Sequence, residues 1–219
     1  MIDPKSIKLP GLLQDWYGSP EAPSSHLSND LAWLPEPLRE WHELSSQWAK
    51  PLMTVKRMLP PESITLQDGK AVFMDDPGDA EWAFAPDSPL DVYEGTLYEG
   101  WEKCAESLPE FLVHNALFEA GYNATSRRYC YEVPEDLLPQ LLTPMTEVAF
   151  GGWRWPSPGH RIFMGEGLVA NMGPTQEDSA PFGGKPGYAD IQIGSTDPTL
   201  LSYLDDIPDL NSVKAGLLG

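Results

Sequence analysis

The sequence is short of basic residues and of cysteine, and each shortage argues against a class of protein. Lys and Arg together number 14 against 33 Asp and Glu, so the formal net charge is −19. So negative a chain repels phosphate backbones and anionic membrane surfaces, which argues against a nucleic-acid or membrane partner. The two cysteines, Cys104 and Cys130, are too few for a disulfide framework, and we expect reduced thiols. Arg127 and Arg128 could lower the pKa of the Cys130 thiol slightly.

Long apolar runs and targeting patterns are also missing. No apolar run approaches the roughly 20 residues that a membrane span needs. The first five residues lack a basic stretch followed by an apolar one, so no signal peptide is expected. These features predict a soluble, cytoplasmic protein.

Motifs for catalysis or for cofactor binding are absent as well. The patterns G-x-S-x-G, H-E-x-x-H and the P-loop do not occur, and turns explain the glycines near residues 165 and 183. No two histidines have metal-ligand spacing. His42 and His114 lie off the apolar stripes of predicted helices, so we expect them to be solvated or half-buried. The sequence therefore predicts no enzyme, no catalytic residue, no cofactor and no metal.

What is present is enough apolar surface for a core, divided into short elements. Hydrophobic residues make up 41% of the chain and aromatic residues 11%, which argues against disorder. The 23 prolines are about twice the usual share of roughly 5%, so we expect short helices and strands. The order of these elements is helix, helix, strands, helix, strands, helix. Because the strands cluster, we predict the α+β class with a largely antiparallel sheet.

Local patterns place these elements along the chain. Leucines and tryptophans at helical spacing predict helices at 9–17 and 35–48. Ser107 and Glu110 form a capping box for a helix at 108–120, with Gly121 as the residue that ends it. Asp68-Gly69 predicts a hairpin turn. The remaining predictions are a helical turn at 134–138, a last helix at 197–207, and strands at 63–66, 70–74, 81–85, 91–93, 147–155, 161–164, 168–172 and 188–193.

The acidic residues are concentrated in one segment. Between Asp75 and Glu102 there are nine carboxylates and no Lys or Arg, together with five aromatic residues. Strands alternate their faces, so one face of a sheet would present carboxylates with aromatic residues beside them, a surface that suits a basic protein. In the alternative interpretation, the aromatics form the core and the carboxylates only solvate the outer face. The candidate partner-binding residues are Asp75, Asp76, Asp79, Glu81, Asp87, Asp91, Glu94, Glu99 and Trp101.

The segment from Leu34 to Gly121 resembles the SUKH superfamily of bacterial proteins. The features that carry the resemblance are Leu34-Pro35 before an amphipathic helix, the hairpin strand Val72-Phe73-Met74-Asp75, the aromatic strand Trp82-Ala83-Phe84, and the helix opened by Ser107-Leu-Pro-Glu-Phe-Leu112. The later Gly165-Glu-Gly167 hairpin and the helix at 197–207 are also similar. The resemblance implies a curved, mostly antiparallel sheet packed against several helices. It implies one domain over residues 31–219, with residues 1–30 as an extension that carries a short helix.

Many members of that superfamily are thought to be immunity proteins that neutralise toxins, often basic nucleases, in competition between bacteria. The resemblance therefore implies a non-catalytic binding module whose partner is a basic toxin. Two alternatives stay open: an adaptor or regulatory scaffold for an endogenous partner, and an enzyme of unrecognised type. The negative charge also has an alternative explanation, because salt-adapted organisms have generally acidic proteins.

Overall fold

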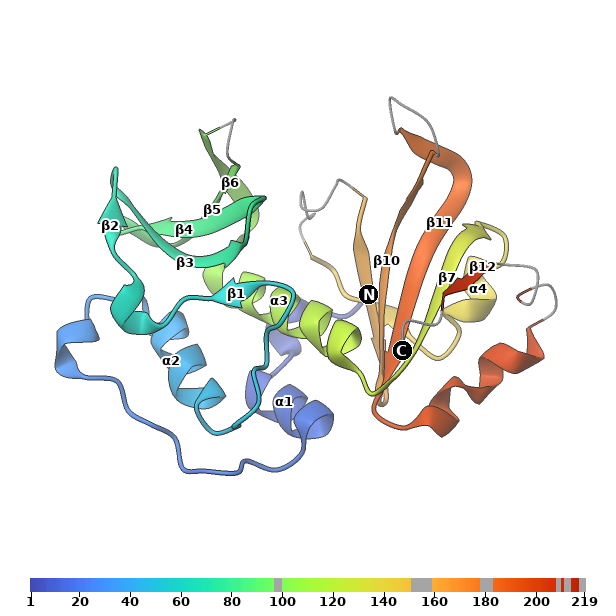
Figure 1. The fold of residues 1–219 in the computed structure, drawn as a ribbon, viewed down its shortest axis with the longest axis horizontal. Coiled ribbons are helices and arrows are strands. Elements are labelled where there is room, and N and C mark those ends of the chain that lie inside the picture. Colours follow the sequence, from blue (N-terminus) through green and yellow to red (C-terminus); the bar gives the residue numbers. More distant parts are fainter. Residues whose placement is uncertain (97–99, 151–158, 178–182, 208–209, 211–213, 217–219) are drawn as a thin grey trace. The chain divides into compact units, whose positions relative to one another are not determined.

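The chain divides into two compact units, each with its own sheet (Figure 1). The computed structural model describes residues 1–96, 100–150, 159–177, 183–207, 210 and 214–216. The N-terminal unit is Pro4–Glu119, and the C-terminal unit combines Met1–Asp3 with Ala120–Gly219. The α+β class and the antiparallel pairing are confirmed, with the strands shared between two sheets. That residues 31–219 form one domain, with residues 1–30 as an extension, stays a prediction.

The N-terminal unit contains a six-stranded antiparallel sheet and three α-helices among its described residues. The strand order is β1-β3-β4-β5-β6, with β2 paired to β3. The helices are α1 (Leu9–Tyr17), α2 (Glu36–Ser45) and α3 (Leu108–Asn123), with 3-10 turns at Pro4–Ser6, Asn29–Leu31 and Pro61–Ser63. The strands are β1 (Arg57–Met58), β2 (Leu66–Gln67), β3 (Lys70–Asp76), β4 (Ala80–Ala85), β5 (Ser88–Thr96) and β6 (Gly100–Ser107).

Local signals set several of these boundaries. The helix predicted at 9–17 is α1, residue for residue. Asp68 and Gly69 have φ values of 51° and 76°, the two positive angles of a tight hairpin turn between β2 and β3. The Glu110 carboxylate accepts hydrogen bonds from the backbone N–H (2.9 Å) and the hydroxyl (2.5 Å) of Ser107, which is the return half of the predicted capping box.

Aromatic side chains join the sheet of this unit to α3. The Phe111 ring packs edge-on against Phe73 and at a tilt against Trp82, with centroids 6.0 Å apart in both pairs. Trp82 and Phe73 are fully buried. One face of the sheet therefore packs against helices. The side chains that alternate with these core residues along each strand point to the opposite face, called the outer face below.

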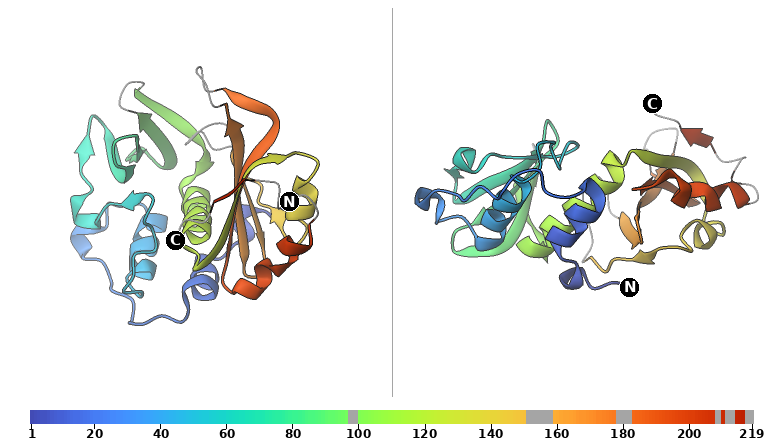
Figure 2. Two further views of the ribbon diagram at one scale, coloured as in Figure 1. Left: turned by 45° about the vertical axis from the view of Figure 1, so that its right-hand side comes forward. Right: turned by 90° about the horizontal axis from the view of Figure 1, so that it is seen from below.

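The C-terminal unit has a second antiparallel sheet in the order β12-β7-β11-β10-β9-β8. Its elements are β7 (Ser126–Pro134), α4 (Leu138–Leu141), β8 (Thr146–Glu147), β9 (Arg161–Gly165), β10 (Leu168–Gln176), β11 (Gly184–Ser195), the 3-10 helix η4 (Pro198–Asp206) and β12 (Lys214–Gly216). In both views of Figure 2, α4 and η4 lie along one face of this sheet, where Leu141, Leu201 and Leu204 enter its core. An isolated parallel bridge joins Ile2 to Val148, so the first residues of the chain belong to this unit.

The last four residues of α3, from Ala120 to Asn123, belong to the C-terminal unit and pack closely on β10 and β11. A Cβ atom on Gly194 would lie 2.4 Å from the Gly121 carbonyl oxygen, and one on Gly121 would lie 2.9 Å from Asn171 Nδ2. The same carbonyl accepts a hydrogen bond from Gln192 Nε2 at 3.1 Å. The prediction that Gly121 ends the helix is therefore wrong, because α3 continues to Asn123 and the glycine is needed for close approach.

Other predicted boundaries also change. Ser63 lies in a 3-10 turn instead of a strand, and η4 replaces the last α-helix, with Asp197 accepting from the Thr199 N–H as its cap. Strands β6 and β7 were not predicted. The strand predicted at 147–155 is β-structure only at its start, and its residues from 151 lie outside the described part. No helix among the described residues is both long and apolar enough to cross a membrane.

Candidate functional site: the outer face of the first sheet and the polar network behind it

A single cross-strand row runs over the outer face of the first sheet. The register pairs Arg57 with Asp75, Asp75 with Glu81, Glu81 with Gly95 and Gly95 with Trp101, so one residue from each of β1, β3, β4, β5 and β6 stands in line. Directly opposed residues in a sheet have neighbouring side chains on the same face. The row therefore brings a guanidinium, two carboxylates and an indole together from segments far apart in sequence.

The row borders a hollow of about 490 Å³, called the acidic hollow below. The hairpin turn between β3 and β4 adds Asp76 and Asp79, so that four carboxylates and one guanidinium line it. Asp79 and Glu81 are exposed, whereas Asp75 is held by Arg57 through bonds of 2.9 Å from Nε and 2.5 Å from Nη2. The hollow is therefore a net acidic surface in which Asp79 and Glu81 face solvent.

Trp101 forms an apolar wall of this hollow. The backbone of Gly95 leaves room for its ring, since a Cβ atom there would lie 2.9 Å from two carbons of the indole. The ring is half-buried, so part of it is available for contact. A flat aromatic surface beside carboxylates can hold the stem of a Lys or Arg side chain while the charged head meets the oxygens.

The structure brings five of the nine candidate residues together and places three others elsewhere. Asp75, Asp76, Asp79, Glu81 and Trp101 line the acidic hollow. Asp87 lies in the turn between β4 and β5, and Asp91 binds Lys103 at 2.7 Å, both toward the opposite end of these strands. Glu94 points to the helix side, where it is only 7% exposed. Glu99 lies outside the described residues.

The aromatic residues of the acidic segment divide between the two interpretations. Trp82 and Phe84 are core residues, with 0% and 1% of their surface exposed. Trp101 lines the hollow, and Tyr93 lies beneath the Lys70 ammonium at 4.1 Å. Tyr98 lies outside the described residues. Part of the aromatic content is thus structural, and part is at the surface.

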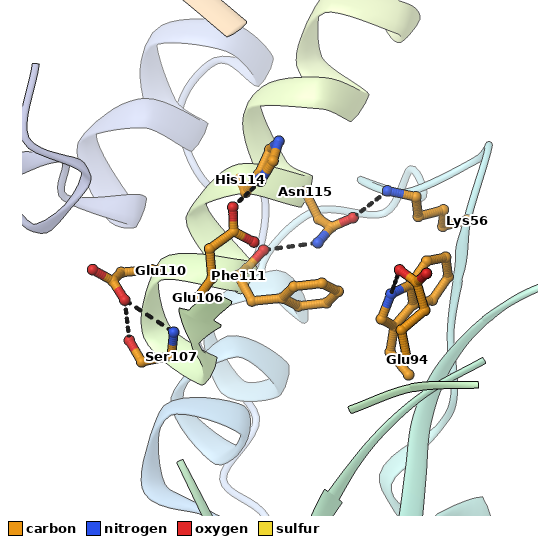
Figure 3. A network of polar contacts seen from close by, with 9 residues as sticks. Lys56, Glu94, Glu106, Ser107, Glu110, Phe111, His114 and Asn115 are labelled. Atoms are coloured by element: carbon orange, nitrogen blue, oxygen red, sulfur yellow. Dashed lines mark hydrogen bonds and ion pairs between the residues drawn. The ribbon is translucent and has the colours of Figure 1, made fainter. Parts of the chain in front are cut away.

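Behind the sheet lies a buried polar network that sequence reasoning missed (Figure 3). The Glu119 carboxylate, fully buried on α3, accepts three successive backbone N–H groups, from Thr54 (2.8 Å), Val55 (3.1 Å) and Lys56 (2.8 Å). These bonds fix the segment that leads into β1. We call this arrangement the Glu119 clamp.

Lys56 is the only lysine among the described residues that is fully buried, at 1% exposure. Its ammonium donates to Asn115 Oδ1 at 2.5 Å and lies over the rings of Trp82 and Phe118, at 5.1 and 4.6 Å from their centroids. Burial lowers the pKa of Lys56 to about 7, and four carboxylates oppose that effect without cancelling it: Glu119, Asp76, Glu106 and Glu94. The amine therefore changes charge near neutral pH.

Two further pairs complete the network. His114 Nδ1 lies 2.7 Å from Glu106 Oε1, with both side chains buried, so the expectation of a solvated or half-buried His114 is wrong. Trp82 Nε1 donates to Glu94 Oε2 at 3.1 Å. A sequence signal existed, because Phe111, Asn115 and Glu119 are spaced by four and share a helix face with core residues.

Burial shifts the pKa values of three other side chains, Cys104, Cys130 and His42. Both cysteines are free thiols. Burial raises the pKa of Cys104 to about 12 and also raises that of Cys130, where Arg128 opposes the effect only in part, so the expected lowering at Cys130 is wrong. Half-buried His42 has its pKa lowered to about 4 by burial. Among the described residues, no group of three or more His, Cys, Asp or Glu is placed to hold a metal ion.

The comparisons with known proteins add no relative. No family model matches this chain, and neither does any curated protein or solved structure.

Proposed function

We propose that this chain is a non-catalytic binding protein whose partner is a basic protein that docks on the acidic hollow. The observation that carries the proposal is the cross-strand row, which places exposed carboxylates and a half-buried indole around one hollow. Carboxylates steer a basic partner during encounter, and a partly buried aromatic ring supplies contact area. The net charge of −19 favours the same partner.

The enclosure of the buried network supports a binding role over a catalytic one. Lys56 and His114 are groups that enzymes use as bases, but their side chains are 1% and 2% exposed. A catalytic base must come within hydrogen-bond reach of its substrate. The network instead ties α3 to the sheet and to the segment before β1, and so supports the surface that carries the hollow.

The biological role that we propose is that of an immunity protein, which binds and neutralises a basic toxin in bacterial competition. This part of the proposal depends on the resemblance of residues 34–121 to the SUKH superfamily. The acidic hollow is compatible with it, because a basic nuclease would meet complementary charge there. We propose a cytoplasmic location for the same reason, since an immunity protein must meet the toxin where it acts.

The direct test is binding to the product of a toxin gene next to this one, measured by titration calorimetry and by protection of cells that express the toxin. We expect a complex and protection. Absence of both would overturn the immunity role, and recovery of a host protein in place of a toxin would favour an adaptor.

Two charge reversals test the surface. Asp79→Lys alters the acidic hollow, and Asp87→Lys makes the same change in another exposed turn of the same sheet. We expect Asp79→Lys to slow association by about tenfold at low ionic strength and less at high salt, with Asp87→Lys close to wild type. Equal effects of the two variants would remove the hollow from the contact.

A further inference from the structure

Among the described residues, the sheet of the N-terminal unit ends at β6, which pairs only with β5 (Figure 1). The register between these two strands is regular from Gly100 to Lys103. Alternate residues of a strand direct their N–H and C=O groups to opposite sides, so two of these four residues direct theirs away from β5. An edge of this kind is a template on which a further strand can pair.

The opposite edge of the same sheet is less suited to strand addition. There β1 consists of Arg57 and Met58, and β2 consists of Leu66 and Gln67. Strands this short offer few backbone groups to a partner, which is one way in which proteins protect their sheet edges. Arg57 already binds Asp75, the carboxylate of the cross-strand row nearest to that edge. The edge that suits an incoming basic chain is therefore β6.

The cross-strand row continues out to this edge and determines which side chain fits there. The acidic hollow is lined by Gly100 and Trp101 of β6, so it reaches the last strand of the sheet. The Trp101 indole lies over Gly95 of β5, on the side of Glu81. A residue added opposite Trp101 would extend the row on the same face. Its backbone would lie three strand spacings from that of Glu81, about 14 Å, which a long cationic side chain and a glutamate can bridge together along the indole.

We propose that an extended segment of a basic protein adds to this sheet as an antiparallel strand beside β6, with a Lys or Arg opposite Trp101 whose charge meets Glu81. The backbone of β6 binds any extended chain, whereas the indole and the carboxylate select a cation at one position. A second copy of this chain suits the edge less, because each copy carries a net charge of −19. The inference rests on the proposed function for its basic partner and adds the conformation in which that partner binds.

The first experiment tests the backbone pairing with a peptide of alternating lysine and valine, blocked at both ends. In an extended chain the N–H groups of the lysines face one edge and those of the valines face the other. N-methylation of all lysines or of all valines therefore gives two peptides of equal charge, only one of which can still pair with β6. We expect one to bind within about twofold of the parent peptide and the other at least about tenfold more weakly, because it loses backbone hydrogen bonds. Equal effects of the two methylations would overturn strand addition.

The second experiment tests the side-chain contact with the unmethylated peptide. Glu81→Gln should raise its Kd about fivefold at low ionic strength, because the cation loses its carboxylate. Glu40→Gln makes the same change at an exposed position of α2 and should leave the Kd unchanged. Equal Kd values for the two variants would overturn the pairing of the cation with Glu81.

The closing experiment measures hydrogen exchange of the β6 amides by NMR, with and without the unmethylated peptide. We expect alternate amides between Gly100 and Lys103 to exchange at least about tenfold more slowly in the complex, and those of β1 to stay unchanged. Binding without this protection would overturn strand addition and leave the proposed function standing. A peptide that does not bind would overturn the inference alone, since Asp79→Lys tests docking of a folded basic protein. A dimer of the free protein with its β6 amides already protected would assign the edge to a second copy and overturn the proposal.

Discussion

Replacement of Glu119 by glutamine should destabilise the N-terminal unit strongly. Its two carboxylate oxygens accept three backbone N–H groups within 3.1 Å, and the side chain is completely buried. A glutamine keeps only one acceptor oxygen. If that oxygen serves Thr54 and Val55, its amide group faces the N–H of Lys56, donor against donor.

The size of the loss can be worked out from these bonds. A hydrogen bond to a charged acceptor contributes about 1.5–3 kcal/mol, and a buried donor left without an acceptor costs about 1–3 kcal/mol. The variant loses one such bond outright and the charge at the other two, so we expect about 3–5 kcal/mol, the range found when one partner of a buried ionic contact is removed. With a urea slope of about 2 kcal/mol/M, the unfolding midpoint should fall by about 2 M.

Urea unfolding followed by tryptophan fluorescence measures this loss, because six of the eight tryptophans belong to the N-terminal unit. Glu40→Gln is the matched control, the same chemical change at an exposed position of α2. We expect that control to stay within about 0.5 kcal/mol of wild type. If Glu119→Gln and Glu40→Gln change the free energy of unfolding equally, the three hydrogen bonds do not stabilise the unit as we expect.

Further predictions concern pH, packing and binding. The pKa of Lys56 is lowered from 10.5 to about 7 in the folded state, so the unfolded chain holds this proton more tightly. The contribution of Lys56 to the free energy of unfolding should therefore rise as the pH increases from about 7. Urea midpoints at several pH values measure this rise, which should be absent in Lys56→Met. Gly194→Ala should destabilise the C-terminal unit by about 1–3 kcal/mol, since the new Cβ would meet the Gly121 carbonyl. Gly11→Ala lies in α1 with open space around the new Cβ, so in the same unfolding assay it should stabilise the N-terminal unit by about 0.5–1 kcal/mol. Trp101→Ala should weaken partner binding by about 2 kcal/mol without changing the urea midpoint by a comparable amount, and an unchanged Kd would remove the indole from the contact.

The sequence predicted the elements whose signals are local. The stripe of α1 and the turn at Asp68-Gly69 are complete within a few residues, and both were placed correctly. Strand β6 was missed because it ends directly at the start of α3, and β7 was missed because only Ala124 and Thr125 separate it from the end of that helix, so neither strand is bounded by a recognisable turn sequence. Gly121 followed the usual pattern of a helix end, but the close approach of Gly194 from a distant strand decides its role.

The candidate site was predicted in composition but not in geometry. Five residues of the acidic segment line the hollow, whereas Glu94 alternates with Gly95 of the cross-strand row and so turns its side chain to the helix side. Lys56 and Glu119 could not be paired from sequence. They lie 63 residues apart, and only the fold brings the backbone of one to the carboxylate of the other.

The bridge between Ile2 and Val148 joins two residues that are synthesised far apart in time. During synthesis Ile2 leaves the ribosome before the N-terminal unit, and Val148 leaves after it. Ile2 therefore cannot form this bridge until the whole N-terminal unit has been synthesised. Contacts between residues so distant in sequence form late and slowly. A short tag or a charge placed beside Ile2 should thus slow the folding of the C-terminal unit and leave the folding rate of the N-terminal unit unchanged.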